Sequence, residues 1–573
     1  MIKVSDDFIN TQKGKLDSSF FQEYDEKTRL VKKDKVDYKV DEKYYRRWKL
    51  EFSLGEEMPF GTMANSFFRS GNFIYSMLGM SHACGGPHSF NCIKDRAVGN
   101  KNFKGGEIDI ESNNNNDSYA HKAVQNPDNG GKEIYRYDLE QDKWIPIGRL
   151  KYIKPMAGMI NWTYKDKFYL LGGYSFQRMD PDFLKEYQEK YGKWPDKKGE
   201  WYSSDLKEIT IKNNNEIIEK TIPLKMFTNS IMSNIQINNK IFFIAGVNGK
   251  KQKCWLSSKE LIEYIDDKEW KQKISKMGDK IYLGSILFFI NMDEFHKGVQ
   301  IETIFPGIPC MSYELNEYKN HIYFFSSHTY STSSWSSFRP GERNRASCPN
   351  NWKYNLKDKK WTRISDWPFP AHCSKKVINV GDVSFILGGN NGFMKTSIDY
   401  MKKDNKNFEY FTEDNYSEMI EKIPEIKISY EKDKNGIWKC KDNEIDAFFK
   451  FGTCTNHYSL FNTIEQKSVT SLESIKSYDY FQHYFSDIIA FYDFKEDKFY
   501  LSDHNLPMNI GACTSKYMVY NDHVYLFGGE SNDILFNYQF PMISSCLIHK
   551  IKYDKYLKEG VYNKNIGGPG YFS

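Results

Sequence analysis

The sequence predicts an all-β fold, a β-propeller built from a repeated unit of four antiparallel strands. The first observation is a hairpin pattern, clearest at Asn505–Glu530, where an Asn521-Asp522 turn precedes an apolar strand that ends at Gly528-Gly529. Apolar strands on both sides of a tight Asn/Asp turn are typical of a β-hairpin. The second observation is that related hairpins recur along the chain, at 59–79, 153–173, 221–246, 308–327 and 367–389.

The spacing inside these hairpins is nearly constant. Cys513 is fifteen residues before Gly528, and the same separation joins Cys373 to Gly388 and Ala157 to Gly172. A small residue thus recurs at the start of each first strand. We interpret Cys310, Cys373, Cys454 and Cys513 at this position as compact apolar residues close to the propeller axis, with no role as a reactive ring of thiols.

A second hairpin follows the first in most repeats, and its two strands each carry an aromatic residue. The pairs are Tyr137 with Trp144, Tyr354 with Trp361 and Tyr492 with Phe499, and Tyr264–Trp270 is interpreted as a shorter version. One repeat is therefore four strands, the first two apolar and the last two more polar. Such a unit cannot bury its faces alone, so the repeats are expected to pack against one another as propeller blades.

The number of blades depends on an irregular repeat at Phe449–Phe499, which lacks the paired glycines. We predict seven blades with this repeat, against six without it. Two short strands with a turn at Asp41-Glu42 precede the first full repeat, and we expect the N-terminus to close the ring by supplying the outer strand of the last blade. The predicted divisions are a charged arm at 1–37, the propeller at 38–560 and a tail at 561–573.

An apolar strand ending in Gly-Gly, followed by Tyr-Asp and then by Trp, resembles the kelch repeat. The resemblance covers about residues 45–557 and is clearest around Gly172-Gly173, Gly388-Gly389 and Gly528-Gly529; it is weaker at Ser326-Ser327 and Ala245-Gly246. It implies a kelch-type β-propeller. Some kelch-like propellers are enzymes, among them galactose oxidase and sialic acid mutarotase, but this chain shows no matching catalytic motif, so we favour a protein without enzymatic activity.

Composition argues against several classes of partner. The chain of 573 residues has 80 Lys and Arg against 75 Asp and Glu, with the two signs mixed, so nothing favours nucleic acid or an anionic membrane. No apolar run is long enough for a membrane helix, and the polar N-terminus is unlike a signal peptide. The ten cysteines are dispersed without a CxxC pair, which favours a reducing, cytoplasmic location.

Long insertions are expected to rise from one face of the propeller. In a blade with strands a to d from the axis outward, the a–b and c–d turns share one face, and the b–c and d–a connections share the other. The a–b turns are short, and the long stretches fall in the second group: 80–132, 174–201, 271–305, 328–350 and 401–445. We predict short helices at 181–192 and near 417–422, and a recognition face formed by these loops.

The best candidate binding site lies in the insertion at 328–350. Arginine side chains there alternate with aromatic ones, and this combination recognises carboxylates, phosphates or stacked rings. The competing interpretation is a solvated loop that folds on itself. The candidate residues are Tyr330, Trp335, Phe338, Arg339, Arg343 and Arg345.

A metal site is a weaker candidate. His82, Cys84, His88 and Cys92 lie within eleven residues and could surround a zinc ion, but their spacing matches no standard zinc motif. We therefore predict neither a metal nor another cofactor, and no catalytic residue.

These observations predict a non-enzymatic scaffold that binds a protein partner through the long loops of one face. The alternative is a carbohydrate-binding or carbohydrate-active propeller whose arginines meet an acidic sugar. A broad loop surface would favour the scaffold, and a deep pocket of carboxylates and arginines would favour the alternative.

Overall fold

The structure is a computed structural model. It describes residues 48–56, 58, 65–79, 132–153, 156–176, 189, 200–227, 229–230, 233–248, 254–307, 309–310, 313–325, 342–343, 346–347, 351–365, 375–389, 395–396, 412–422, 428–432, 438–440, 486–511, 516–531, 543–544 and 548–554.

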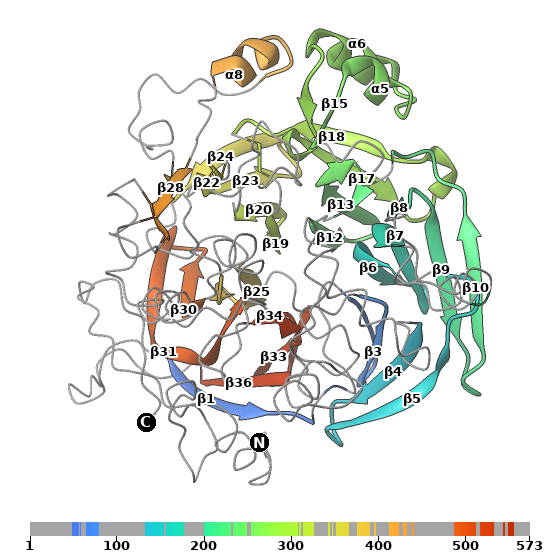
Figure 1. Cartoon of the computed structure of the whole chain (residues 1–573), viewed down its shortest axis with the longest axis vertical. Helices are drawn as coiled ribbons and strands as arrows, with labels where there is room; N and C mark the ends of the chain where they lie inside the picture. The colour runs from blue at the N-terminus through green and yellow to red at the C-terminus, as the bar shows by residue number, and fades with distance from the viewer. Residues whose placement is uncertain are drawn as a thin grey trace.

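The described residues form a β-propeller of six blades, each with four antiparallel strands (Figure 1). The first blade contains β2 (Ser66–Ser70), β3 (Phe73–Met77), β4 (Glu133–Asp138) and β5 (Lys143–Arg149). The second contains β6 (Ala157–Tyr164), β7 (Lys167–Phe176), β9 (Leu206–Ile211) and β10 (Ile217–Ile222). The third contains β12 (Ser233–Ile237), β13 (Lys240–Ile244), β17 (Ile286–Asn291) and β18 (Gln300–Ile304).

The remaining blades follow the same order of strands from the axis outward. The fourth contains β19 (Glu314–Tyr318), β20 (His321–Phe325), β23 (Asn351–Asn355) and β24 (Lys360–Ile364). The fifth contains β25 (Lys376–Val380), β26 (Val383–Leu387), β30 (Ser486–Asp493) and β31 (Lys498–Gly511). The sixth contains β32 (Lys516–Tyr520), β33 (His523–Phe527), β36 (Ile548–Asp554) and, from the N-terminal part of the chain, β1 (Lys49–Leu54).

The prediction of seven blades is wrong. The outer hairpin that we assigned to a separate blade, β30–β31, pairs with β26 and completes the fifth blade instead. The predicted inner strand of that extra blade, at 449–461, lies outside the described residues. The spacing of the aromatic residues predicted the β30–β31 hairpin correctly. The long insertion before this hairpin made it impossible to recognise from the sequence that it joins the inner strands β25 and β26.

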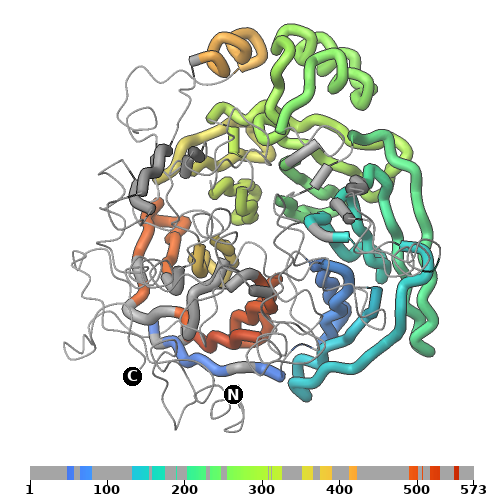
Figure 2. The backbone as a smooth tube through the Cα atoms, viewed as in Figure 1, coloured from blue at the N-terminus to red at the C-terminus, as the bar shows by residue number. Residues whose placement is uncertain are grey.

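The sixth blade combines strands from both ends of the chain. β1 pairs antiparallel with β36, from Lys49 opposite Asp554 to Leu54 opposite His549. Trp48, just before β1, contacts Tyr553 of the sixth blade and also Phe385 and Phe491 of the fifth, with ring centroids 5.2–6.2 Å apart. The colours of Figure 2 accordingly run once around the ring, and the blue β1 lies beside the red strands.

Turn chemistry explains the short inner hairpins. The first residue of each a–b turn has a positive φ in all six blades: Gly71, Lys165, Asn238, Lys319, Gly381 and Asn521. Two-residue turns with left-handed backbone match the twist of the strands that they join. Register in the sixth blade runs from Lys516 opposite Phe527 to Tyr520 opposite His523, as the Asn521-Asp522 turn predicts.

The Tyr-Asp pair of the outer hairpin is structural. In the first blade, the Asp138 carboxylate accepts hydrogen bonds from the backbone N–H groups of Glu140 and Gln141, which form the turn. The Tyr137 hydroxyl donates to Asp142, a turn residue with φ +55°. Asp493, Tyr492 and Asp497 repeat this arrangement in the fifth blade.

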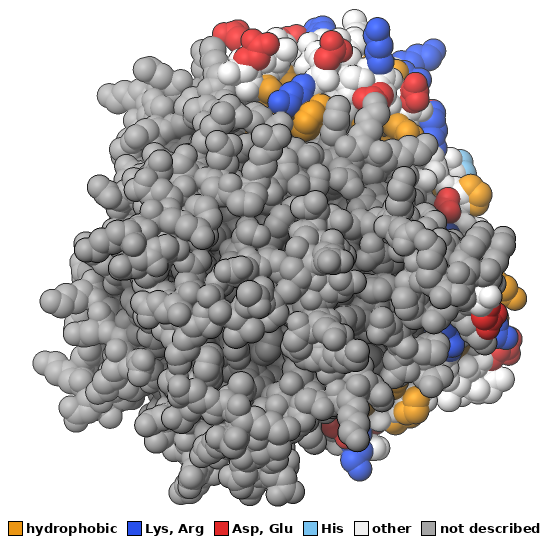
Figure 3. Space-filling view, viewed as in Figure 1, with side chains coloured by type: hydrophobic (Ala, Val, Ile, Leu, Met, Phe, Trp, Pro, Cys, Tyr) orange, Lys and Arg blue, Asp and Glu red, His pale blue; other side chains and the backbone are white. Residues whose placement is uncertain are grey.

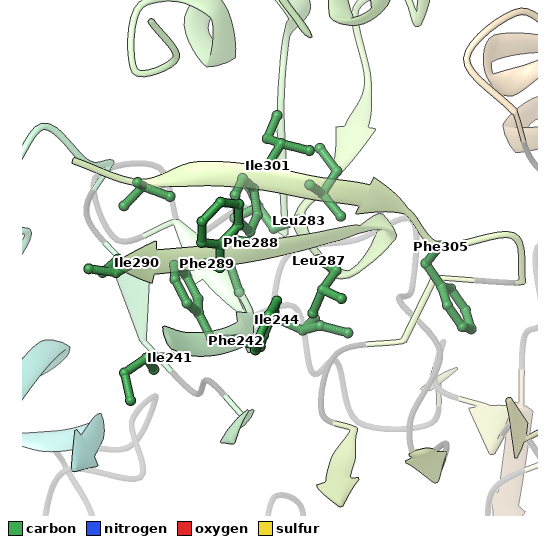
Figure 4. Close-up of a cluster of buried hydrophobic side chains, with 14 of the residues drawn as sticks. Ile241, Phe242, Ile244, Leu283, Leu287, Phe288, Phe289, Ile290, Ile301 and Phe305 are labelled. Carbon is green, nitrogen blue, oxygen red and sulfur yellow. The ribbon is translucent and has the colours of Figure 1, made fainter. Parts of the chain in front are cut away.

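The largest core lies around the third blade (Figure 4). Phe242, Ile244 and Leu287 are buried between sheets, and Phe243 stacks on Phe288 with centroids 5.6 Å apart. Each such side chain contributes about 1.5–3 kcal/mol through burial. Because both faces of every blade are covered by neighbours, the second strands are mostly apolar, with Ser76 and Ser384 as buried polar exceptions.

The long connections are all of the b–c type: 78–132, 177–205, 245–285, 326–350, 388–485 and 528–547. The third insertion was placed wrongly at 271–305, because β17 and β18 occupy its second half. Tyr264–Trp270 was also misread: it joins two helices, α5 (Ser258–Ile262) and α6 (Lys268–Lys276). The predicted helix near 417–422 is confirmed as α8 (Tyr416–Lys422), and the helix predicted at 181–192 lies outside the described residues apart from Glu189.

The structure also contains short strands and two short 3-10 helices outside the main blade strands. They are β8 (Glu200–Tyr202), β11 (Asn229–Ser230), β14 (Val247–Asn248), β15 (Trp255–Leu256), β16 (Ile281–Tyr282), η7 (Leu283–Ser285), η8 (Phe295–Lys297), β21 (Glu342–Arg343), β22 (Ala346–Ser347), β27 (Lys395–Thr396), β28 (Ile428–Lys432), β29 (Trp438–Cys440), β34 (Glu530–Ser531) and β35 (Ile543–Ser544).

Candidate functional site: a groove at the propeller rim

A groove of about 1400 Å³ lies at the outer edge of the propeller, between the third and fourth blades. Its floor and one wall come from the outer strands β18, β23 and β24, and its other wall comes from α6 and the segment before α8. Figure 1 shows these helices projecting beyond the ring of blades. We refer to this site as the rim groove.

Capping interactions fix the helix that carries the outer wall. The Asp267 carboxylate accepts from the backbone N–H of Trp270 at 3.0 Å and so caps the N-terminus of α6. The helix buries Ile274 against the core of the third blade. Trp270 lies in its first turn and lines the groove, together with Lys273 one turn later.

The neighbouring helix α8 is attached to the same blade, although it belongs to the insertion of the fifth blade. Tyr416 is fully buried, and its hydroxyl lies 2.7 Å from Ser285 Oγ and accepts from the backbone N–H of Tyr282 at 3.0 Å. Lys276 of α6 forms an ion pair with Asp414 at 3.0 Å. Thr412 and Glu413 therefore form part of the groove wall.

The floor is a packed set of aromatic rings. Trp361 lies among Phe324, Tyr354 and Phe305, with ring centroids 4.7, 4.8 and 5.3 Å away. Its indole N–H donates to Thr303 Oγ1 at 3.3 Å. Trp352 and Tyr354 are almost completely buried, so the floor is rigid while the outer face of Trp361 borders the groove.

The charges of the groove balance. Its lining contains four cationic side chains, Lys273, Lys297, Lys359 and Arg363, and four acidic ones, Asp266, Asp267, Glu302 and Glu413. Glu302 accepts from the Tyr354 hydroxyl at 3.0 Å and pairs with Lys359. Burial, and then the Glu302 charge, raise the pKa of Tyr354 well above its usual value, so its hydroxyl stays protonated.

Figure 3 shows hydrophobic, acidic and basic side chains adjacent to one another over the helical insertions at the top of the view. A concave surface with aromatic planes, hydroxyl groups and balanced charges can bind a polypeptide segment of mixed polarity. It offers no excess positive charge to a polyanion.

The six binding residues predicted in 328–350 are not brought together in the part of the chain that the structure describes. Only the backbone of Arg343 is described: it lies in β21, where it pairs with Ile428 of β28. Tyr330, Trp335, Phe338, Arg339 and Arg345 lie outside the described residues, as do His82, Cys84, His88 and Cys92. Binding by these residues stays a prediction.

Sequence reasoning missed the rim groove because it used Tyr354 and Trp361 only to mark an outer hairpin and interpreted Trp270 as part of a shorter hairpin of the same kind. A signal for the helices was present. Ser257 and Glu260 form a reciprocal capping box, and Asp267 precedes a helical sequence with Ile274 on its buried face.

Within the described residues, no helix is both long and apolar enough to cross a membrane. No family model matches this sequence, and no curated protein matches it either. Among solved structures, one titled "Structure of YjhT" is similar, with a TM-score of 0.43 and 9% sequence identity over 86% of this chain and 95% of that chain. The fold assignment therefore rests on the six four-stranded sheets themselves.

Proposed function

We propose that this protein is a kelch-type β-propeller scaffold, closed by β1, that binds a protein partner through the rim groove. The observation that carries the proposal is the groove itself, in which insertions of two different blades form one wall opposite a floor of packed aromatic rings. Residues of mixed polarity around aromatic anchors are typical of protein-recognition surfaces.

The groove favours an extended polypeptide segment as its ligand. An apolar side chain of the partner would contact Trp270 and the exposed face of Trp361. Polar partner groups would bond with Gln300, Thr303 and Thr362, which border the same groove. This proposed surface lies at the rim between the third and fourth blades, and it adds to the predicted surface in the loop at 328–350, which stays a prediction.

An acidic sugar is the alternative predicted from residues 330–345, and those residues lie outside the described part of the chain. In the rim groove, four acidic side chains offset the four cationic ones, which disfavours an anionic glycan there.

A matched pair of variants on α6 tests the proposal. Trp270→Ala removes the aromatic side chain that lines the groove, and Gln272→Ala changes an exposed residue of the same helix that does not line it. Partner proteins are captured from native cell extract with each tagged protein and quantified by mass spectrometry. We expect Trp270→Ala to reduce capture of the principal partner more than tenfold, since loss of an interface tryptophan costs about 2 kcal/mol or more.

The Gln272→Ala protein should capture the partner as the unchanged protein does. Thermal unfolding of both variants shows whether the blades remain folded. Equal capture by all three proteins would contradict binding in the rim groove.

A further inference from the structure

The inner strands of three consecutive blades begin with a charged residue. β19 begins with Glu314, β25 with Lys376 and β32 with Lys516. Each of these residues stands five positions before its a–b turn, so the three occupy equivalent places around the propeller axis. Ser66 and Ser233 occupy this position in the first and third blades.

Contacts and charge effects between the blades bring these side chains near one another at the propeller axis, a region that we call the central channel. Lys376 is 9% exposed, and its Nζ lies 3.0 Å from both carboxylate oxygens of Glu314. Lys516 donates from Nζ to Asn161 Oδ1 of β6 at 3.2 Å. The first blade lies between the sixth and second blades in the ring, so Lys516 reaches past the first blade to contact Asn161.

Asn161 is oriented for this contact. Its Nδ2 donates to the backbone oxygen of Phe67 in the first blade at 2.5 Å, which fixes the plane of the amide. The remaining amide oxygen then faces Lys516. An ammonium group has three hydrogens, and Asn161 is the one acceptor that the described residues provide within hydrogen-bonding distance of Lys516.

The cluster has an unbalanced charge. Two ammonium groups and one carboxylate give a net charge of +1, and the carboxylate already accepts two hydrogen bonds from Lys376. Burial, and then the neighbouring Lys376 charge, lower the pKa of Lys516 to about 8, although Glu314 acts in the opposite direction. A partly buried ammonium that pairs with no carboxylate among the described residues is unfavourable, and a bound monovalent anion would balance its charge.

We propose that the central channel binds a small monocarboxylate, with its carboxylate against Lys516 and beside the Lys376–Glu314 pair. Tyr517 supplies the adjoining apolar surface: the residue is 40% exposed, and the centroid of its ring lies 5.8 Å from Lys376 Nζ. The three charged side chains of the cluster, all within the described residues, carry a net charge of +1, which one monoanion would neutralise and a dianion would exceed. This site is separate from the rim groove and does not depend on the proposed scaffold function.

Binding of radiolabelled acetate to the full chain at pH 7 tests the proposal. Equilibrium dialysis is performed in chloride at constant ionic strength, with inorganic phosphate as a competitor. We expect saturable binding of one acetate per chain, and weaker competition by phosphate than by unlabelled acetate. An absence of saturable binding, or stronger competition by phosphate, would overturn the proposal.

Three variants give different expected results. Lys516→Met should weaken acetate binding at least tenfold. Lys319→Met removes a lysine at the other end of the inner hairpin of the fourth blade and should leave binding unchanged. Glu314→Gln removes the negative charge beside the two lysines and should strengthen binding. Unchanged affinity in Lys516→Met, or weaker binding in Glu314→Gln, would contradict the assigned site.

A measurement on the unchanged protein avoids any effect of substitution on folding. Raising the pH from 7 to 9 deprotonates Lys516, and acetate affinity should fall about tenfold because about one chain in ten keeps the ammonium form one unit above the pKa. Affinity that stays constant over this range would exclude Lys516 as the anion-binding group.

Discussion

The hydroxyl of Tyr416 lies 2.7 Å from Ser285 Oγ, which joins the insertion of the fifth blade to the insertion of the third. The two residues are 131 positions apart in the sequence and both are completely buried. Because α8 is attached here, Thr412 and Glu413 are held at the rim groove. The shape of the groove therefore depends on a contact outside the repeated blades.

Replacing Tyr416 with phenylalanine should loosen α8 without altering the propeller. The substitution removes the two buried hydrogen bonds that the Tyr416 hydroxyl makes with Ser285 and with the Tyr282 backbone N–H, at a cost of about 1–3 kcal/mol. Hydrogen exchange should accelerate in 412–422 and stay unchanged in β25 and β26. Tyr152→Phe, at a residue that is 81% exposed, is the control and should have no effect. Unchanged exchange in Tyr416→Phe would mean that the hydroxyl does not anchor α8.

Asp142 should contribute to stability above mildly acidic pH. It accepts from the Tyr137 hydroxyl and the Glu56 backbone N–H, and it pairs with Lys550 of the sixth blade at 3.2 Å. Burial raises the pKa of Asp142, but these interactions outweigh burial and leave it below its usual value. Asp142 therefore contributes its full amount to the free energy of unfolding above about pH 4, the pKa of an aspartate in the unfolded chain. This contribution is lost as the pH falls through the lower pKa of Asp142 in the folded protein.

Asp142→Asn should lower the free energy of unfolding at pH 7 by about 2 kcal/mol, because it removes charge-assisted hydrogen bonds. The difference from the unchanged protein, measured by urea unfolding, should shrink below pH 4. Asp166→Asn changes an a–b turn residue whose left-handed φ asparagine tolerates, and it should be nearly neutral. A difference that stays constant down to pH 2 would contradict the assigned role of Asp142.

Lys516 should make the protein more stable as the pH rises above 8. Its folded pKa of about 8 lies below the unfolded value of about 10.4, so the unfolded chain binds more protons between these values. Relative to Lys516→Met, the unchanged protein should gain about 2 kcal/mol between pH 8 and 10, since each pKa unit corresponds to about 1.4 kcal/mol and part of the 2.4-unit difference lies outside this range. Urea unfolding without added carboxylate measures this gain. If the free energies of unfolding of the two proteins change with pH in parallel, the pKa of Lys516 is not lowered by folding.

The hairpins were predictable because the same physical requirement recurs in every blade. Strands buried on both faces become apolar runs, and tight turns need residues such as Asn521 or Gly381 that adopt positive φ. The pair of Tyr137 and Asp138 was likewise visible, because one residue fills the core and the other forms the turn. What this local pattern could not specify was the partner of β30, which is separated from β26 by a long insertion.

The functional groups were harder to predict, since they combine residues from different insertions and blades. Trp270 and Trp361 border one groove only because α6 lies next to the fourth blade. Lys376 and Lys516 could have been related by aligning the a–b turns, since each stands five residues before its turn. The approach of Lys516 to Asn161 depends on closing the ring and has no local signal in the sequence.

The most direct test of the scaffold proposal is photo-crosslinking from inside the rim groove. A benzophenone amino acid replaces Thr362, which is exposed in the groove, or Thr221, an exposed residue on the outer strand of the second blade. We predict a covalent adduct between the principal partner and the protein that carries benzophenone in place of Thr362, and no adduct with the protein that carries it in place of Thr221. An excess of unlabelled protein should prevent formation of the adduct, whereas an excess of its Trp270→Ala variant should not. A partner that crosslinks from Thr221 and not from Thr362 would contradict binding in the rim groove.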